Sequence, residues 1–191
     1  MGLAEDRRKW NRRYAESNPA QQAIEPHPLA LQYRPWITAG PMLDVACGLG
    51  RGIAAFHDLC NPCIGVDLSD VALREARATW CEHPQVHLLA SDVMTQQWSK
   101  SYFVLICAFG FTDWRFFARI PGLLRPGGVF LYEGFSRRRL QLKPDMDPAW
   151  TSTEADLRSL APGWPVLLFE EDAESCRNRF ALQRPFGTVA E

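Results

Sequence analysis

Short apolar runs alternate with stretches of helical periodicity between Pro41 and Tyr132. Apolar runs bounded by turn signals predict buried strands, and apolar positions three or four apart predict helices that cover them. The strands expected from these runs span residues 42–46, 63–66, 86–89, 102–107 and 128–133. Strands that alternate with helices in this way are typical of βαβ units and of a parallel sheet covered on both faces.

One connecting helix is predicted over residues 69–80. Leu73, Ala76 and Trp80 fall on one face of it, and Ser69 is placed to cap its first turn. This segment is therefore expected to be an amphipathic crossover helix between two parallel strands.

The pattern becomes less regular beyond the fifth strand. Residues 124–128 predict a turn that ends a helix and starts that strand. Residues 137–150 contain two prolines and show no clear period. The spacing of Thr151 and Glu154 is that of a capping box, which predicts a helix after this stretch.

Two final apolar runs, at residues 166–170 and 178–183, predict an antiparallel pair of strands. The complete pattern predicts an α/β fold. We expect a doubly wound, seven-stranded, mostly parallel sheet with an antiparallel C-terminal strand and helices on both faces.

Composition and charge narrow the organisation and the partners. A chain of 191 residues, 47% hydrophobic and 23% charged, can bury one substantial core, so we expect a single domain over residues 1–191. Residues 1–35 are expected to form an N-terminal helical segment and residues 36–191 the core. The formal net charge of −1 gives no field that would hold a nucleic acid or an anionic membrane. A small molecule is the expected partner, and the oligomeric state is left open.

The chain shows no signal for secretion or for a membrane. Its first eight residues carry charges where a secretory signal needs apolar residues, and no apolar stretch approaches the ~20 residues that span a bilayer. We therefore expect a cytoplasmic protein with reduced cysteines. Cys60 and Cys63 form a C-x-x-C pair, but no second Cys or His pair follows at zinc spacing, so no metal is expected.

A turn of small residues follows the first strand. Asp44 ends the strand, and Gly48, Gly50 and Gly52 follow at G-x-G-x-G spacing. A dinucleotide site needs G-x-G-x-x-G, a P-loop needs G-K-[ST] after its glycines, and an acid is unfavourable beside a pyrophosphate. The loop therefore favours a cofactor without phosphate and with positive charge, such as S-adenosylmethionine (SAM).

Two more acids end the next two strands. Asp67 lies 23 residues after Asp44, a distance that fits one crossover helix, and its carboxylate can accept both hydroxyls of a ribose. Asp92 ends the third strand, where it can accept an adenine amino group while the backbone of Val93 meets the ring. The series of three strand-end acids extends the glycine turn into a nucleoside site.

These segments resemble the ordered motifs of class I SAM-dependent methyltransferases, whose fold is Rossmann-like. The tellurite-resistance and thiopurine-type bacterial branch is the most similar. The segments that carry the resemblance are residues 9–14, 43–51, 65–69, 91–93, 124–129 and 131–135. Two positions depart from the pattern: Ala46 stands where many members have a glycine, and Gly110 stands where a polar or basic residue is expected.

The resemblance implies a role for each matching residue. Asp44 is directed toward the methionine amino group of SAM, Gly48 and Gly50 lie under the cofactor, and Asp67 binds the ribose. Asp92 and Val93 meet the adenine. The neighbouring positions that also belong to the implied site are Ala46 and Leu68.

The N-terminal segment allows two interpretations. Trp10 and Tyr14 are four residues apart and share a helix face, with Arg13 beside them. In the family such a segment folds over the cofactor as a lid, and all three residues would then contact it. The alternative is a helix that packs its aromatic side chains on the domain.

The sequence predicts the methyl donor better than the acceptor. The leading hypothesis is in-line transfer of the SAM methyl group to the sulfur, nitrogen, oxygen or metalloid nucleophile of a small molecule, which yields S-adenosylhomocysteine. The alternatives are an RNA or protein methyltransferase and a non-catalytic SAM-binding protein. No catalytic residue is assigned; Tyr14, His57 and Glu133 are weak candidates for a base. Residues 137–139, three arginines, either face an anionic substrate or form a solvated loop, and residues 114–119 either adjoin a substrate or pack on the sheet.

Overall fold

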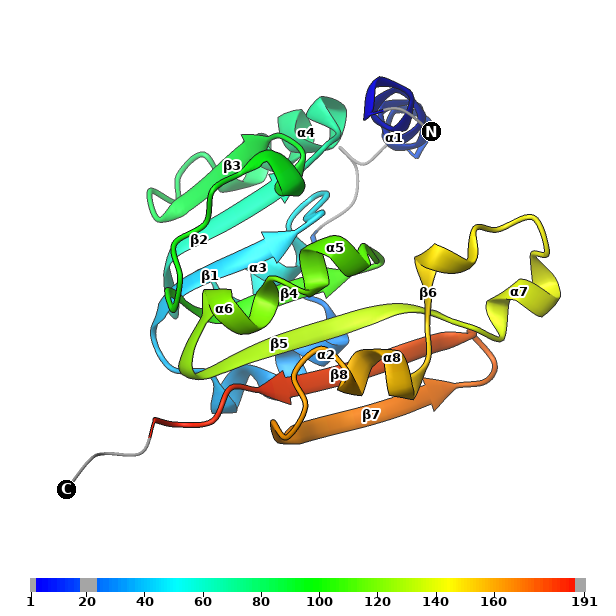
Figure 1. The fold of residues 1–191 in the computed structure, drawn as a ribbon. Coiled ribbons are helices and arrows are strands. Elements are labelled where there is room, and N and C mark those ends of the chain that lie inside the picture. The colour runs from blue at the N-terminus through cyan, green and yellow to red at the C-terminus, as the bar shows by residue number, and fades with distance from the viewer. Residues whose placement is uncertain (1–2, 18–23, 188–191) are drawn as a thin grey trace. The chain divides into compact units, whose positions relative to one another are not determined.

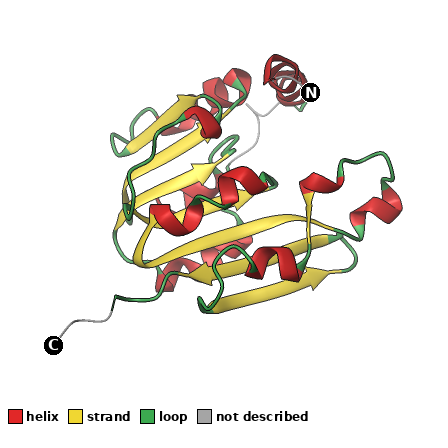
Figure 2. Ribbon diagram, in the orientation of Figure 1, coloured by secondary structure: helices red, strands yellow, loops and turns green. Residues whose placement is uncertain are grey.

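The computed structural model describes residues 3–17 and 24–187 as a mixed α/β fold (Figure 2). The chain divides into two compact units, an N-terminal unit that ends at Gln97 and a C-terminal unit that begins at Trp98. Each unit is described by itself.

The N-terminal unit consists of a three-stranded parallel sheet and its helices (Figure 1). The strand order within it is β3-β2-β1, and the register pairs Leu43 with Ile64 and Ile64 with His87. Its elements are α1 (Leu3–Glu16), α2 (Pro28–Tyr33), the short 3-10 helix η2 (Arg34–Trp36), β1 (Gly40–Val45), α3 (Arg51–Phe56), β2 (Cys60–Asp67), α4 (Asp70–Trp80), β3 (Val86–Ala90) and the 3-10 helix η3 (Val93–Thr95).

Helix α4 forms as its sequence predicts. The hydroxyl oxygen of Ser69 accepts a hydrogen bond from the backbone N–H of Ala72 at 3.1 Å, which caps the first turn. Leu73, Ala76 and Trp80 are buried along one face. The burial of that face fixes α4 as the crossover between β2 and β3, and it thereby places the end of β2 beside the start of the helix.

The C-terminal unit contains the remaining strands, in the order β4-β5-β8-β7, with β6 beside the end of β5. Strands β4 and β5 are parallel, whereas β8 is antiparallel to both of its neighbours. Its elements are β4 (Phe103–Phe109), α5 (Trp114–Phe117), α6 (Ile120–Leu123), β5 (Leu124–Ser136), α7 (Arg139–Leu142), the 3-10 helix η4 (Pro148–Trp150), β6 (Thr151–Ser152), α8 (Glu154–Arg158), β7 (Val166–Asp172) and β8 (Arg177–Gln183).

The predicted fold class is confirmed: parallel strands, an antiparallel C-terminal strand and surrounding helices form a Rossmann-like arrangement. Three details of the prediction were wrong. The described residues form eight strands rather than seven, because Thr151 and Ser152 pair with the end of β5 as the short strand β6. The helix after it is capped by Thr153 and Asp156, two residues later than the predicted pair Thr151 and Glu154.

The third error concerns residues 124–128, which were expected to form a turn and instead begin β5. The pairing of β5 with β4 jumps from Leu124 to Val129, so the segment is an irregularity within one long strand. Gly127 has a φ of 77°, and the end of β8 holds the segment because the Gln183 side chain donates to the Gly127 carbonyl at 3.1 Å. Glycine is suited to position 127 because the backbone there is left-handed. Turns also favour glycine for this reason, so the sequence pattern resembles that of a turn.

Each unit has its own apolar core. In the N-terminal unit the fully buried side chains include Met42, Leu43, Ile53, Phe56 and Leu73, and in the C-terminal unit they include Phe103, Phe116, Phe117, Phe130 and Phe180.

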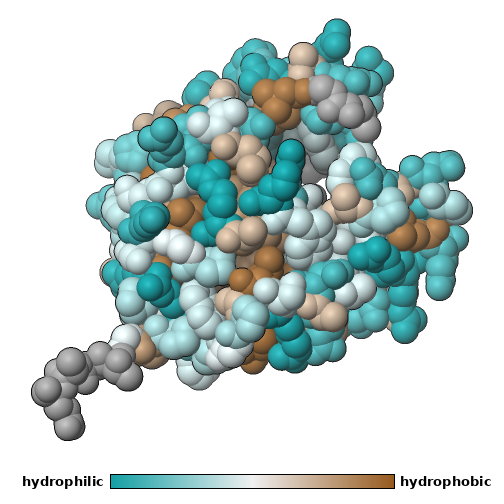
Figure 3. All heavy atoms as spheres, in the orientation of Figure 1, coloured by the Kyte–Doolittle hydropathy of each residue, from teal (hydrophilic) through white to brown (hydrophobic). Residues whose placement is uncertain are grey.

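None of the helices in the described residues is long and apolar enough to cross a membrane. On the face drawn in Figure 3, the described apolar side chains lie in small groups among hydrophilic ones rather than in one extended patch. The prediction of a single domain over residues 1–191 stays a prediction.

Candidate functional site

The turn after β1 is an unusual piece of backbone. Ala46, Gly48 and Gly50 all have positive φ, at 52°, 54° and 90°. Two backbone hydrogen bonds hold the turn: the Cys47 N–H donates to the carbonyl of Val66 at 3.1 Å, and the Gly50 N–H donates to the carbonyl of Cys47 at 2.8 Å. Left-handed residues at alternate positions leave backbone N–H groups and little side-chain bulk at the end of β1, as a cofactor cradle requires.

Asp44 lies buried under this turn. Its side chain accepts a hydrogen bond from the Ile53 N–H at 3.3 Å, and the Gly52 N–H also supports it, so the carboxylate caps the first turn of α3. The pKa of Asp44 is raised to about 8, mainly by burial and also by the charge of Asp67, while hydrogen bonds from the Ile53 and Gly52 N–H groups oppose the shift. A buried acid with this pKa gains most from a ligand that brings positive charge.

Asp67, at the end of β2, is tied to the same turn. Its two oxygens accept from the Gly48 N–H at 2.8 Å and from the Ser69 N–H at 2.7 Å. Burial raises the pKa of this carboxyl, and the two N–H groups lower it. A carboxylate oxygen can accept more than one hydrogen bond, so Asp67 holds the turn and still has capacity for ligand hydroxyls.

Helix α1 brings Tyr14 to the turn. The Tyr14 hydroxyl lies so close to Gly48 that a Cβ at position 48 would collide with it. Burial, followed by the charge of Asp67, raises the pKa of the Tyr14 hydroxyl, so it stays neutral. The absence of a side chain at position 48 therefore serves two purposes: it permits the left-handed backbone, and it makes room for Tyr14.

Asn11 anchors α1 to the start of α4, and the sequence reasoning missed this residue. Its amide donates to Asp70 Oδ1 at 2.8 Å, and its carbonyl oxygen accepts from the Ser69 hydroxyl at 2.8 Å. Because the Ser69 N–H donates to Asp67, a continuous series of hydrogen bonds joins α1 to the strand-end acid. The available signal was the position of Asn11 three residues before Tyr14, which places both on one side of a helix.

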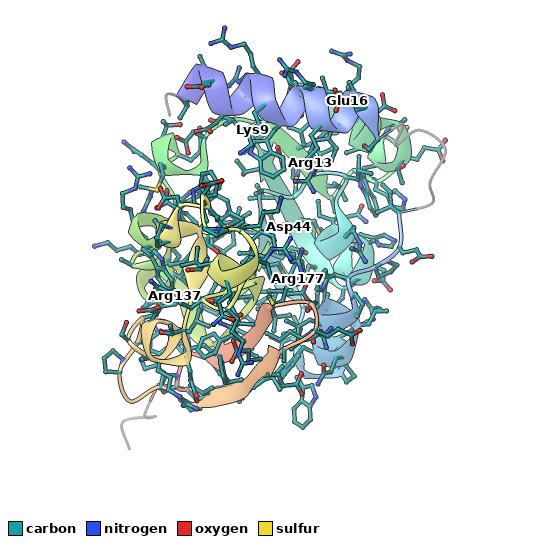
Figure 4. The ribbon with its side chains drawn as sticks, turned by 90° about the vertical axis from the view of Figure 1, so that its right-hand side faces the viewer. Lys9, Arg13, Glu16, Asp44, Arg137 and Arg177 are labelled. Carbon is teal, nitrogen blue, oxygen red and sulfur yellow. The ribbon has the colours of Figure 1, made fainter. Side chains whose placement is uncertain are left out.

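Trp10 and Arg13 contact each other, and their roles at the cofactor stay predictions. The Arg13 guanidinium lies 5.2 Å from the centre of the Trp10 ring, and the Lys9 amine lies 5.9 Å from it. Arg13 is exposed and Trp10 is half-buried. Figure 4 shows Lys9 and Arg13 leaving α1 toward the side on which Asp44 lies, with Glu16 near the end of the helix. Of the three predicted residues of α1, Tyr14 meets the turn at Gly48.

Trp80 contacts the glycine turn at Leu49 and Gly50. The sequence predicted it only as a core residue. Its indole N–H donates to the Leu49 carbonyl at 3.0 Å, and a Cβ at Gly50 would lie 2.7 Å from the same nitrogen. A buried Trp needs a partner for its N–H, and this need is a usable signal in the sequence. The glycine turn is therefore fixed between Tyr14 and Trp80.

The third acid, Asp92, has a local structural role. Asp92 accepts from the Met94 N–H at 2.9 Å and caps η3, and the next residue, Val93, is buried. Leu68 is half-buried between Asp67 and Ser69. The roles of Asp92, Val93 and Leu68 toward adenine stay predictions.

The cysteines of the described residues are free. Cys63 donates its S–H to the carbonyl of Cys60 at 3.0 Å inside β2, and burial raises the pKa of its thiol to about 12. Burial also raises the pKa of Cys47, so neither residue is a reactive thiolate. The described residues contain no group of three His, Cys, Asp or Glu side chains that could hold a metal ion.

The arginines after β5 are mostly neutralised. Arg137 pairs with Asp156 at 3.2 Å, and Arg138 pairs with Glu171 at 3.3 Å (Figure 4 labels Arg137). Arg139 instead lies over the ring of Phe135, with its guanidinium carbon 5.1 Å from the ring centre. The three consecutive arginines therefore do not form one free basic patch.

The aromatic residues after β4 pack into the core, which favours the second interpretation of residues 114–119. Phe116 and Phe117 are fully buried, and Phe117 makes ring contacts with Phe130 and Tyr132. Asp113 caps this segment as α5 and pairs with Arg115 at 2.6 Å. Gly110 has a φ of 77°, so a side chain there would be strained.

Comparisons with known proteins agree with this geometry. Residues 42–128 match the model of a methyltransferase domain family, a span that contains Asp44, Asp67 and Asp92. No curated protein matches the chain in sequence.

Several solved structures share the fold. A protein from the conversion of a disulfide bond into a thioacetal group in echinomycin biosynthesis is 16% identical, with a TM-score of 0.69 over 96% of this chain and 93% of that one. Phosphoethanolamine N-methyltransferase 2 of Haemonchus contortus, solved with SAM, is 17% identical, with a TM-score of 0.64 over 86% of this chain and 54% of that one. The cyclase SpnF is 15% identical, with a TM-score of 0.64 over 83% of this chain and 79% of that one.

At these identities the structural likeness shows a common fold. The family match and the fold together support a class I SAM-dependent methyltransferase. The assignment to the tellurite-resistance and thiopurine-type branch stays a prediction.

Proposed function

We propose that the protein binds SAM at the glycine turn and transfers its methyl group to a small molecule. The observation that carries the proposal is the pair of buried acids at adjacent strand ends, Asp44 and Asp67, which meet a turn without side chains at Gly48 and Gly50. Phosphate would be repelled by these acids, whereas SAM brings an ammonium group and a sulfonium to the site. The residues present therefore fit this cofactor.

Each of the predicted site residues binds a different part of SAM. Asp44 supplies negative charge for the ammonium group, Asp67 accepts the ribose hydroxyls, and Asp92 with Val93 holds the adenine. Bound SAM supplies an activated methyl group, so the protein has mainly to align the acceptor and exclude water. Tyr14, which lies over Gly48 with a neutral hydroxyl, is positioned to cover the cofactor and to donate one hydrogen bond.

A small acceptor is favoured over RNA by the ion pairs of the C-terminal unit. RNA binding needs a contiguous patch of unpaired basic side chains. Arg137 and Arg138 each have a carboxylate partner, and Glu133 accepts from both Arg177 and Arg179. Neutralised arginines of this kind offer little electrostatic attraction to a phosphate backbone.

Calorimetry with SAM and with S-adenosylhomocysteine tests the proposal. We expect both to bind, and Asp67→Asn to weaken binding by about tenfold or more because hydrogen bonds to a charged group are lost. Asp58→Asn is the matched control, since Asp58 is an exposed acid of the same unit that pairs with Arg34. The proposal would be wrong if neither compound bound, or if the two variants behaved alike.

A second candidate, SAM binding without methyl transfer, is favoured by the fold of the cyclase SpnF, whose name gives a different chemistry. The two candidates differ in one product. Methyl transfer releases S-adenosylhomocysteine in proportion to acceptor, so its formation across a panel of thiols, amines and metalloid oxyanions supports the first candidate. Tight SAM binding without turnover of any acceptor class supports the second.

A further inference from the structure

Strand β3 forms the outer edge of the sheet in the N-terminal unit (Figure 1). Its one neighbour among the described strands is β2, to which it is parallel. Both faces of β3 are poorly covered, because each of its residues is half-buried or exposed, and the side chain of Leu89 is 39% exposed. An edge strand of this kind presents a row of backbone groups that can pair with another strand.

The hydrogen bonds to β2 decide which backbone groups of β3 face outward. The Gln85 carbonyl accepts from the Cys63 N–H at 2.8 Å, and the Ser91 N–H donates to the Asp67 carbonyl at 2.9 Å. These two bonds lie at the two ends of β3, and with the register they show that its odd-numbered residues bond to β2. The even-numbered residues therefore direct their backbone groups to the outer edge; they are Val86, Leu88 and Ala90.

Most of these outward groups have no partner within the part of the chain that the structure describes. The Val86 N–H donates to the His83 carbonyl at 2.9 Å. The N–H groups of Leu88 and Ala90 have no such acceptor, and the carbonyls of all three residues have no donor. The edge therefore offers unpaired donors and acceptors to a strand that approaches from outside.

The edge of β3 also lacks the charges that usually prevent strands from associating. Strand β7, the edge strand of the C-terminal unit, ends in three acids, Glu170, Glu171 and Asp172. Residues 83–91, which contain β3, include no Asp, Glu, Lys or Arg. Electrostatic repulsion therefore protects β7 from a second copy of itself, whereas it does not protect β3.

We propose that β3 is the surface through which two copies of this chain associate, with the two strands antiparallel about a twofold axis at Leu88. Residues of an antiparallel pair exchange hydrogen bonds at alternate positions. With Leu88 opposite itself, each Leu88 N–H meets the Leu88 carbonyl of the other copy, and each Ala90 N–H meets a Val86 carbonyl. This register uses every unpaired donor of both strands and does not need the Val86 N–H, which is already bonded.

The side chains of this register fit a second copy as well. His87 lies opposite Leu89 of the second copy on the same face, with Cβ atoms about 4.5–5.5 Å apart. Both side chains are exposed in the single chain, and the twofold axis repeats the contact. The strand is thus complementary to itself in hydrogen bonds, charge and side-chain contact, as an isologous interface requires. A strand of another protein is the alternative occupant, and it would need none of this symmetry.

Sedimentation equilibrium of the full chain from about 1 μM to about 1 mM tests the association. We expect a monomer–dimer equilibrium within this range, because one short strand pair is a small interface. Leu89→Lys should weaken the dimer by about tenfold or more, since it places a charge in the interface twice. Leu167→Lys is the matched control, because Leu167 is also 39% exposed but belongs to β7, and it should associate as wild type does. A chain that stays monomeric throughout, or equal weakening by the two variants, would overturn the proposal.

A charge exchange tests the register. The double variant His87→Glu/Leu89→Lys places opposite charges across the twofold axis, so it should associate about tenfold more tightly than Leu89→Lys alone. No gain in the double variant would exclude this register.

Hydrogen exchange of the wild-type chain locates the interface without any substitution. The amides of Leu88 and Ala90 should exchange more slowly as the protein concentration rises. The amides of His87 and Leu89 should change little, because they are bonded to β2 in the single chain as well. Dimerisation without slower exchange at Leu88 and Ala90 would place the interface elsewhere and contradict the assignment to β3.

Discussion

The hydroxyl of Tyr14 occupies the space that a side chain at Gly48 would need. A helix near the start of the chain and the turn after β1 therefore meet at a point that neither sequence segment specifies alone. The contact also connects α1 to Asp67, because the Gly48 N–H donates to that carboxylate.

The Tyr14–Gly48 contact predicts a coupling that a double-mutant cycle measures. Gly48→Ala should lower the free energy of unfolding by about 2 kcal/mol, from a left-handed alanine and from the collision with the hydroxyl. In the Tyr14→Phe background the cost should fall by about 1 kcal/mol, because the nearest atom is then gone. Equal costs in the two backgrounds, measured by urea unfolding, would show that α1 does not lie on the turn in solution.

The ionised form of Asp44 should destabilise the folded chain, although it is the form that binds a cationic cofactor. Its pKa is about 8 in the folded chain and 3.8 in a model peptide, so the folded state holds the proton more tightly. Stability from this group is complete below the lower value and is lost as the pH rises through about 8. Asp44→Asn should therefore raise the free energy of unfolding by about 1 kcal/mol or more above that pH, with little gain near the lower value.

The same carboxyl should make SAM binding depend on pH. A cationic ligand binds the ionised form, so association below the folded pKa of about 8 releases a proton. Affinity should rise with pH up to that value, and calorimetry in buffers of different ionisation enthalpy should detect the released proton. In Asp44→Asn both the proton release and most of the affinity should disappear. Proton release that persists in this variant would assign the titration to another group.

Replacing Ala46 by glycine should stabilise the protein. Its φ of 52° lies in the left-handed region, where an L side chain costs about 1–2 kcal/mol and glycine does not. Ala46→Gly should therefore raise the free energy of unfolding, by about 1 kcal/mol after the larger entropy of the unfolded glycine chain is subtracted. Ala54→Gly in α3 is the control and should lower stability by about the same amount, since it lies in a helix. A loss of stability in both variants would contradict the turn geometry.

Trp80 should contribute to the shape of the cofactor turn. Trp80→Phe keeps most of the apolar contact and leaves the Leu49 carbonyl without its 3.0 Å donor, at a cost of about 1 kcal/mol. Because Leu49 lies between the glycines, SAM affinity should also fall. Trp36→Phe is the control, since Trp36 is 74% exposed, and both its stability and its SAM affinity should match wild type. Normal SAM affinity in Trp80→Phe would mean that the turn keeps its shape without this support.

Asn11 decides between the two interpretations of α1. Asn11→Ala removes the hydrogen bonds to Ser69 and Asp70, so hydrogen exchange in α1 should become faster in the free protein. If α1 is a lid, SAM should slow exchange in α1 of both wild type and variant. Exchange in α1 that is unaffected by SAM would establish the packed-helix interpretation.

Much of the fold was predictable because its signals are local. The apolar runs gave the strands, and the face of Leu73, Ala76 and Trp80 gave α4. Local rules failed where distant strands decided the outcome: residues 124–128 look like a turn, yet they begin β5, because Leu124 pairs with Phe103 of β4 and the Gln183 side chain at the end of β8 donates to Gly127. Thr151 likewise has the chemistry of a helix cap, but pairing with Phe135 makes it a strand residue.

The sequence by itself determined the β1 turn, the three strand-end acids and the class of cofactor they suit, because spacing along a βαβ unit sets which residues reach the strand ends. Only the tertiary structure decided which distant side chains complete the site. Tyr14, Asn11 and Trp80 reach the turn through contacts across many residues. Local periodicity shows that a helix or strand has a packed face, whereas burial and hydrogen bonding in the folded chain decide what that face meets.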